Sequence, residues 1–253
     1  MSILDKDKVF GVKDGVVLIQ EPQTVLSQAY LTLRTKEQRI LSNEQVTQLP
    51  QFKGNKQQQK EWKCRQDTLV RFQSYLEKHP NKVILEIGCG NGWFSNAMRP
   101  FAKEVIGQDI NLEELEQAAQ VFPQEALTFV YAHDLVTWLP TLSVDMIVFN
   151  ASFQYFEHVA DIIHLCQKAL NPAGEIHILD TPIYVNTQEA LNAKNRSNAY
   201  YDTMQASDMK HNYFHHVATD FTDFDWMYKP ITNKLLKKLQ KQQSPFPWLR
   251  CAP

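Results

Sequence analysis

Between about residue 80 and residue 180, short apolar runs alternate with longer stretches of mixed polarity. In most of these stretches hydrophobic residues recur at helical spacing, notably over residues 112–121 and 159–170. Strands that alternate with helices in this way form a parallel sheet with helices on both faces. We therefore expect an α/β fold, Rossmann-like and doubly wound. The short apolar runs that predict its strands are residues 83–87, 104–110, 127–131, 145–150 and 175–180.

The first 60 residues follow a different pattern. An Asp14-Gly15 turn between apolar-alternating arms predicts a β-hairpin over residues 10–19. A helical stretch follows and ends near residue 49, and the Gln- and Lys-rich residues 51–60 are typical of a loop or mobile linker. We expect residues 1–60 to form an N-terminal cap. A helix over residues 61–79 would then open the main domain, residues 61–253.

The chain beyond the fifth strand contains a long polar and aromatic stretch, residues 182–220. We interpret it as an insertion, either a lid over the substrate side or a helix pair packed on the sheet edge, and its sequence favours neither. Residues 221–228 and 246–251 could add a strand and an edge strand, with a helix over residues 233–241 between them. These strands would complete a mostly parallel seven-stranded sheet.

Composition narrows the class of protein without identifying it. Hydrophobic residues make up 43 % and the net charge is −2, so there is no electrostatic case for a protein that coats DNA. No apolar run reaches the roughly 18 residues of a membrane span, and the polar start is unlike a signal peptide. We expect a cytoplasmic protein. The four cysteines, which show no metal-ligand spacing, are Cys64, Cys89, Cys166 and Cys251.

The run Glu86-Ile87-Gly88-Cys89-Gly90-Asn91-Gly92 carries the candidate chemistry. Three of the eight glycines fall within five residues after an apolar strand, where they allow the backbone to approach a ligand closely. The third glycine comes one residue too early for the dinucleotide pattern G-x-G-x-x-G. The carboxylate of Glu86 would repel a pyrophosphate and tolerate a ligand that carries an ammonium group. A tight structural turn is the alternative.

This run resembles the acid, G-x-G-x-G motif of the class I S-adenosylmethionine-dependent methyltransferases, and the resemblance extends over residues 61–181. It implies S-adenosylmethionine as the cofactor and S-adenosylhomocysteine as its product. Asp109, 19 residues after Gly90, matches the acid that binds the two ribose hydroxyls. A strand-end turn or an N-cap is the alternative for Asp109. Asp134 matches the acid that receives the adenine amino group.

The segment 145–155 matches the end of the family's fourth strand, which lies beneath the methionine part of the cofactor. Arg65, on the preceding helix, could pair with the methionine carboxylate. Other polar side chains that could contribute from the N-terminal cap are Tyr30, Arg34, Glu37 and Arg39. The cofactor-binding residues that the resemblance implies are Glu86, Gly88, Cys89, Gly90, Asp109, Ile110, Asp134, Leu135, Asn150, Ala151, Tyr155 and Arg65.

Methyl transfer from a sulfonium is a displacement at an activated carbon, so the protein mainly positions the reactants and excludes water. A general base is needed only when the nucleophile must lose a proton early. Tyr155 and His158 are weak candidates for that role. Small-molecule members of the family often carry a histidine near the position of Gln154, and its absence here leaves proton transfer open.

The sequence favours a small-molecule acceptor methylated on oxygen, nitrogen or carbon, and leaves the oligomeric state open. Asn150 lacks the Asn-Pro-Pro-aromatic pattern of enzymes that act on DNA bases or protein glutamine. A protein or RNA methyltransferase is the main alternative, supported only by the basic stretches 53–65 and 229–241, and a non-catalytic S-adenosylmethionine-binding module is the other. No metal is expected, because His211, His215 and His216 lack a carboxylate at a recognised spacing.

Overall fold

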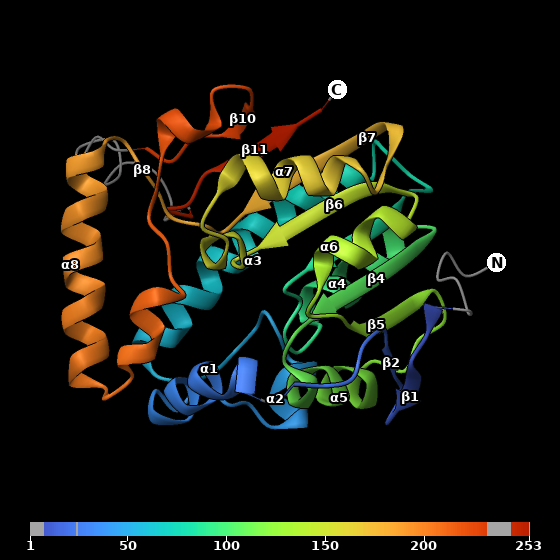
Figure 1. The fold of residues 1–253 in the computed structure, drawn as a ribbon, viewed down its shortest axis with the longest axis horizontal. Coiled ribbons are helices and arrows are strands. Elements are labelled where there is room, and N and C mark those ends of the chain that lie inside the picture. Colours follow the sequence, from blue (N-terminus) through green and yellow to red (C-terminus); the bar gives the residue numbers. More distant parts are fainter. Residues whose placement is uncertain (1–7, 24, 232–243, 253) are drawn as a thin grey trace.

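The computed structural model describes residues 8–23, 25–231 and 244–252. Its centre is a twisted sheet with helices on both faces (Figure 1). Within the described residues the sheet has nine strands in the order β1-β2-β5-β4-β3-β6-β7-β11-β10. The strands are β1 (Gly11–Lys13), β2 (Val16–Leu18), β3 (Val83–Ile87), β4 (Glu104–Asp109), β5 (Leu127–Tyr131), β6 (Val144–Asn150), β7 (Leu170–Leu179), β10 (Asp225–Tyr228) and β11 (Trp248–Cys251).

The predicted doubly wound α/β fold is confirmed. The chain enters the sheet centre at β3, adds β4 and β5 on one side, and then adds β6 and β7 on the other. All these strands pair in parallel, so their carboxyl ends meet at one edge of the sheet. The strand order reverses between β3 and β6, where ligands bind in folds of this type.

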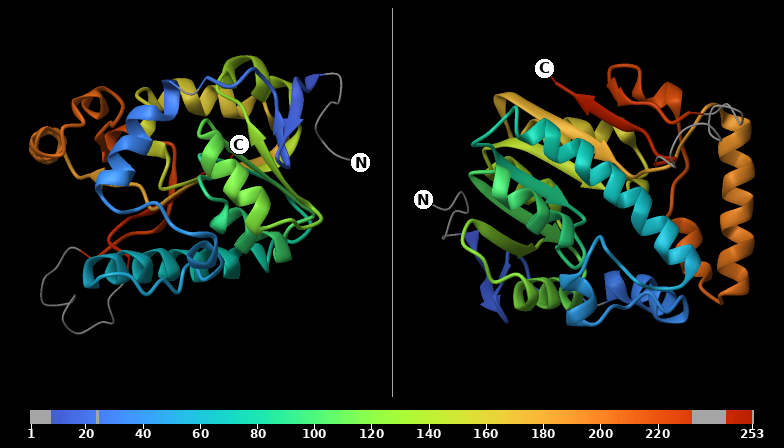
Figure 2. Two further views of the ribbon diagram at one scale, coloured as in Figure 1. Left: turned by 90° about the horizontal axis from the view of Figure 1, so that it is seen from below. Right: turned by 180° about the vertical axis from the view of Figure 1, so that it is seen from behind.

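Strand alternation divides the hydrophobic residues into two cores. On β3, Ile84 faces one core while Leu85 and Ile87 face the other. The first core is covered by α3 (Lys56–Leu76), α4 (Trp93–Met98) and α5 (Leu112–Val121), and the second by α6 (Leu135–Trp138) and α7 (Val159–Gln167). The helices on the two faces are visible in Figure 2.

The N-terminal hairpin corrects the expected seven-stranded sheet. Instead of belonging to a separate cap, β2 pairs in parallel with β5 and extends the sheet. An unpaired β5 edge would leave backbone donors and acceptors open, and β2 satisfies them while burying Val16 and Leu18. The chain after β2 stays on this edge, because the Gln23 amide donates to the Tyr131 hydroxyl at 2.8 Å.

Two further expectations are wrong in detail. The strand over residues 246–251 was expected at the edge, but β11 lies between β7 and β10, and β10 takes the edge. The expected linker 51–60 is helical from Lys56, because Asn55 caps α3 with a capping box to Gln58, and Gln and Lys are good helix formers. The helix expected over residues 233–241 lies outside the described residues.

The insertion after the fifth parallel strand contains one long helix in its described residues, not a helix pair. It consists of β8 (Ile183–Tyr184), α8 (Thr187–Thr203), a 3₁₀ turn over Ser207–His211 and β9 (His216–Val217). Figure 1 shows α8 standing beside the main body. Its end is tied to α1 (Val25–Lys36), because Lys36 Nζ donates to the Met204 carbonyl at 2.8 Å. None of the described helices is long and apolar enough to cross a membrane.

Phe72 on α3 is a test of the first core. Its ring is fully buried, stacked on Phe94 at 5.8 Å between centroids and edge-on to Trp248 at 5.6 Å. We expect Phe72→Ala to lower the free energy of unfolding by about 3–5 kcal/mol, measured by urea denaturation, because it leaves a cavity. The matched control is Phe10→Ala, whose ring is 62 % exposed and should change stability little. Equal effects of the two substitutions would contradict this account of the core.

Candidate cofactor and substrate site

Two adjoining cavities open at the carboxyl edge of the parallel strands. The larger has a volume of about 380 Å³ and the smaller about 120 Å³. The larger one alone falls within the range of roughly 300–1,000 Å³ that small-molecule sites occupy. The residues that line both cavities are Tyr30, Gly88, Gly90, Glu114 and Ala151.

The glycine run forms the floor between the cavities. Gly88 and Gly92 have φ angles of +76° and +72°, which other residues rarely adopt. A Cβ on Gly88 would lie 2.5 Å from the Cβ of Ser152, and one on Gly92 would lie 2.4 Å from the Phe129 ring. A side chain at either position would therefore collide with the sheet or with the turn after β6. These glycines let the loop lie close against its neighbours.

Asp109, at the end of β4, holds this loop in place. Its Oδ2 accepts the Gly90 amide and its Oδ1 accepts the Asn111 amide, both at 2.8 Å. The carboxylate lines the larger cavity with Ile110, and burial raises its pKa. Asn111, not Asp109, is the N-cap of α5. Each oxygen of Asp109 keeps a second lone pair for a ligand hydroxyl.

Glu86 and Asn150 face the smaller cavity as a polar pair. Glu86 is buried and accepts a hydrogen bond from the Ser95 hydroxyl. Burial, with Asp109 as a further negative neighbour, raises the pKa of Glu86 to about 8. Asn150 Oδ1 is buried and has no hydrogen-bond partner among the described residues. A carboxyl group and an orphaned carbonyl beside an open cavity match a ligand that brings an ammonium donor.

Asp134, the expected adenine acceptor, does not line either cavity. Its carboxylate caps α6 by accepting the Thr137 amide at 3.2 Å and the Thr137 hydroxyl at 2.9 Å. These bonds lower the pKa of Asp134. The residues on either side of it, His133 and Leu135, line the larger cavity. Aspartate is a preferred N-cap, so a local role competes with the expected one at this position.

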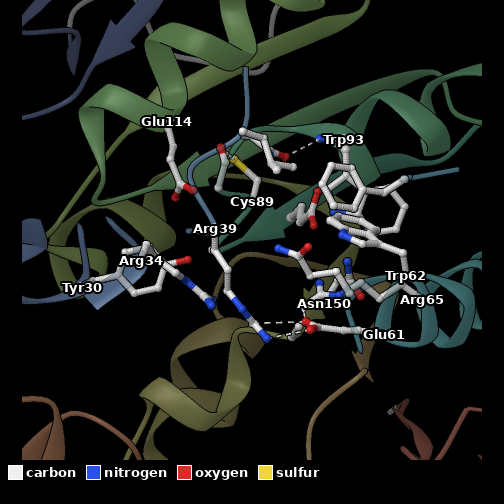
Figure 3. Close-up of a pocket in the computed structure, with 18 residues that line it drawn as sticks. Tyr30, Arg34, Arg39, Glu61, Trp62, Arg65, Cys89, Trp93, Glu114 and Asn150 are labelled. Atoms are coloured by element: carbon white, nitrogen blue, oxygen red, sulfur yellow. Dashed lines mark hydrogen bonds and ion pairs between the residues drawn. The ribbon is translucent and has the colours of Figure 1, made fainter. Parts of the chain in front are cut away.

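A chain of ion pairs crosses the smaller cavity (Figure 3). Arg39 contacts Glu61 at 2.7 Å, and Arg65 contacts the same carboxylate at 3.1 Å. Arg34 contacts Glu37 at 3.2 Å. Burial acts to raise the pKa of Glu61, but the neighbouring Arg65 and Arg39 lower it below its ordinary value. The predicted residue Arg65 therefore lies at the cavity with one of its donors already taken.

The structure separates the two weak catalytic candidates. Tyr155 lines the larger cavity, and its ring lies edge-on to Tyr30 at 6.1 Å and to Tyr213 at 5.9 Å between centroids. Burial raises the pKa of Tyr155. His158 has a side chain that is 70 % exposed, lies 3.8 Å from Glu157 and lines neither cavity.

Several lining residues were not predicted from the sequence. Glu114 on α5 lines both cavities, and burial, with Asp109 as a second cause, raises its pKa to about 7. In the sequence it belongs to an ordinary helix start. Met209 and Asn212, from the insertion, line the larger cavity, and so do Ser27 and Ala29 from α1. Only the aromatic density of the insertion signalled its contribution.

The histidines of the insertion have other surroundings. His215 Nε2 lies 3.0 Å from the Ser197 hydroxyl, and His216 packs against the Phe153 ring at 5.4 Å between centroids. A search of the described residues for three or more grouped His, Cys, Asp or Glu side chains found no candidate metal site.

Comparison with known proteins agrees with this geometry. The sequence model of the methyltransferase domain family matches residues 85–178, which contain the glycine loop, Asp109 and β6. This match supports the resemblance to the class I S-adenosylmethionine-dependent methyltransferases over these residues. Magnesium protoporphyrin IX methyltransferase from Synechocystis PCC 6803 shares its fold, with a TM-score of 0.57 at 14 % identity, over 91 % of this chain and 99 % of that one.

Curated relatives match part of the chain, and two of them illustrate the extent of the match. A probable S-adenosylmethionine-dependent methyltransferase of Mycolicibacterium smegmatis is 28 % identical over 45 % of this chain and 43 % of its own length. Trans-aconitate 2-methyltransferase of Acidovorax sp. (strain JS42) is 31 % identical over 40 % of this chain and 39 % of its own. The match thus spans less than half the length of each relative.

Glu86 makes the stability of the ligand-free protein depend on pH. Its pKa is raised from an ordinary 4.5 to about 8 in the folded state, so its stabilising contribution is full below pH 4.5 and is lost as the pH rises to about 8. We expect the free energy of unfolding to fall more steeply from pH 5 to pH 8 in the parent protein than in Glu86→Gln, measured by urea denaturation. Glu125→Gln, at an exposed position, is the control and should follow the parent. Parallel curves for the parent and Glu86→Gln would contradict the raised pKa.

Proposed function

We propose that this chain is a cytoplasmic methyltransferase that uses S-adenosylmethionine to methylate an oxygen, nitrogen or carbon atom of a small molecule. The observation that carries the proposal is that Glu86 and Asn150 line the smaller cavity beside the glycine loop, with no hydrogen-bond partner for Asn150 Oδ1 among the described residues. S-Adenosylmethionine combines an ammonium group with a nucleoside, and the two cavities offer complementary groups for each half.

The smaller cavity suits the methionine half of the cofactor. Glu86 and Asn150 would accept hydrogen bonds from the ammonium group, and Arg65 would donate to the carboxylate. Gly88 and Cys89 keep the backbone close to the cavity, because both amides are held by the Gln108 carbonyl at 2.8 and 2.9 Å. The residues at this end therefore fit an amino acid with both its charges.

The larger cavity suits the nucleoside half. Asp109 would accept hydrogen bonds from the ribose hydroxyls, using the lone pairs that Gly90 and Asn111 leave. Ile110 and Leu135 provide apolar surface for the adenine ring, and His133 lies at the same end. Asp134 could accept a hydrogen bond from the adenine amino group only through an oxygen that also caps α6.

The bound cofactor would supply a methyl group already activated by a positive sulfur, so the protein's task is to orient the acceptor and exclude water. Tyr155 lines the larger cavity and packs against Tyr30, which lines both cavities, and its raised pKa keeps its hydroxyl protonated at neutral pH. We therefore assign it a role as a hydrogen-bond donor and wall of the acceptor space. It is poorly suited to act as a base.

The enclosure of the larger cavity supports a small molecule as the methyl acceptor. The larger cavity is bounded by α1 on one side and by Met209 and Asn212 of the insertion on another, so elements far apart in sequence close around it. The matched relative that methylates trans-aconitate is named for a small molecule, which agrees with this size. A protein or RNA acceptor would instead require an extended open face.

The cofactor assignment has a direct test. We expect isothermal titration with S-adenosylhomocysteine to show binding, and Asp109→Ala to weaken it by about tenfold or more, because a charge-assisted hydrogen bond and the hold on the glycine loop are lost together. Asp145→Ala is a control at the opposite end of the sheet, where the carboxylate bonds Val83 and Asn171. Failure of the parent protein to bind under any condition would refute the cofactor assignment.

A second measurement isolates the amino acid end. 5′-Methylthioadenosine lacks the ammonium and carboxylate groups of S-adenosylhomocysteine. We expect Glu86→Gln to weaken S-adenosylhomocysteine and leave 5′-methylthioadenosine nearly unchanged in the same titrations, because Glu86 can lose its proton to pair with the ammonium group and the amide cannot ionise. Equal losses for both ligands would show that Glu86 acts on loop structure alone.

A further inference from the structure

Arg34 is the arginine of the ion-pair chain that packs against Tyr30, a residue that lines both cavities. It follows Tyr30 by one helical turn on α1, and its guanidinium carbon lies 4.8 Å from the centre of the Tyr30 ring. Its side chain is 23 % exposed and lines the smaller cavity, while Tyr30 lines both. Figure 3 shows Arg34 beside Tyr30, across the site from Trp62 and Trp93.

The neighbours of Arg34 do not use up its hydrogen-bonding capacity. A guanidinium carries five N–H donors in a rigid fork. Glu37 accepts one of them and the Tyr30 hydroxyl bonds a second, and the Glu37 carboxylate also lies 3.6 Å from Arg39 and accepts a hydrogen bond from Tyr200. The fork of Arg34 thus has donors to spare where it meets the cavity.

Charge also remains unbalanced along this chain of ion pairs. Three guanidinium groups, Arg34, Arg39 and Arg65, share two carboxylates, Glu37 and Glu61. The other carboxyl groups that line the cavity, Glu86 and Glu114, have pKa values raised by burial. A negative group on a ligand would complete the arrangement, and the cofactor's own carboxylate would supply one at Arg65.

The position of Arg34 points to the acceptor more than to the cofactor. Arg65 shares the smaller cavity with Glu86 and Asn150, at the end suited to an amino acid. Arg34 instead adjoins Tyr30, whose ring contacts Tyr155 on the side where the insertion closes the larger cavity. Tyr30, Tyr155 and Met209 line the larger cavity there, and Tyr201 and Tyr213 pack in the same apolar cluster.

Resting on the proposed function, we propose that the acceptor is a small organic anion, and that Arg34 binds its acidic group while the tyrosine cluster holds its apolar body. The tyrosine cluster consists of Tyr30, Tyr155, Tyr201 and Tyr213. A carboxylate and a phosphate both match the guanidinium fork, so the shared chemistry is an oxyanion on an apolar or aromatic body. Arg34 is thus a specificity-determining residue of the site.

The test uses the full chain saturated with S-adenosylhomocysteine and titrated with three probes of similar shape. Benzoate and phenyl phosphate carry the two kinds of oxyanion, and benzamide is the neutral counterpart. We expect at least one anion to bind about tenfold or more tighter than benzamide, as a charge-assisted hydrogen bond requires. The tighter of the two anions identifies the acidic group.

Variants separate Arg34 from its neighbours. Arg34→Gln should remove the preference for anions, and Arg34→Lys should retain part of it, because lysine keeps the charge and loses the fork. The matched control is Arg71→Gln. Arg71 is on α3, where its guanidinium lies over the Tyr228 ring, and it lines neither cavity. It should leave the preference intact.

The outcomes distinguish this inference from the function on which it rests. Failure to bind S-adenosylhomocysteine refutes the proposed function itself. Normal cofactor binding without a stronger response to either anion overturns only the role of Arg34, and the parent protein alone decides this point. A third result would also overturn it: if Arg34→Gln weakens S-adenosylhomocysteine but not 5′-methylthioadenosine, Arg34 binds the cofactor's carboxylate instead.

Discussion

The hydrogen bonds between the end of β4 and the glycine loop are the constraint on which the site depends. The Gln108 carbonyl accepts the Gly88 and Cys89 amides, and the Asp109 carboxylate accepts the Gly90 amide. The loop therefore cannot move without breaking contacts to a central strand. Because Gly88 lies directly against Ser152, the same constraint fixes the loop relative to the turn after β6. Three neighbouring strands are thereby held in register around one small space.

The same rigid site contains three buried acidic side chains, which is unfavourable for the stability of the ligand-free protein. Glu86, Asp109 and Glu114 all have raised pKa values, and in each case burial is the main cause. Buried carboxyl groups with few partners cost stability, and a ligand with matching donors removes that cost. Natural proteins accept such local penalties at binding sites, which is why the cavity residues depart from ordinary folding preferences.

Much of the sheet was predictable because strands buried on both faces leave short apolar runs in the sequence. The strands β3 and β5 match the expected ranges for this reason, and the helix α5 matches because its apolar residues recur at helical spacing. The hairpin's place in the sheet was not predictable, because pairing between β2 and β5 joins segments more than 100 residues apart and depends on which edge is open.

The site shows the same division. The glycine loop and Asp109 could be located because their chemistry requires particular residues at a particular spacing. The cavity roles of Glu114, Met209 and Asn212 could not, since tertiary packing alone turns these ordinary side chains inward. At Asp134 the opposite occurs: the residue matches the family pattern in the sequence, but its carboxylate is bonded to Thr137 of the helix that it caps.

The attachment of the hairpin has a consequence for access to the interior. The segment that carries α1 leaves the sheet at β2, where the Gln23 amide is bonded to the Tyr131 hydroxyl, and rejoins the body where Gln117 on α5 donates to the Leu41 carbonyl and to Asn43 Oδ1. Both ends of the segment are thus anchored, and a chain anchored twice cannot swing away as a free arm. Any movement of α1 would then be limited to an outward bending between these two anchored ends. Because Lys36 ties α1 to the insertion, these two walls of the larger cavity would move together.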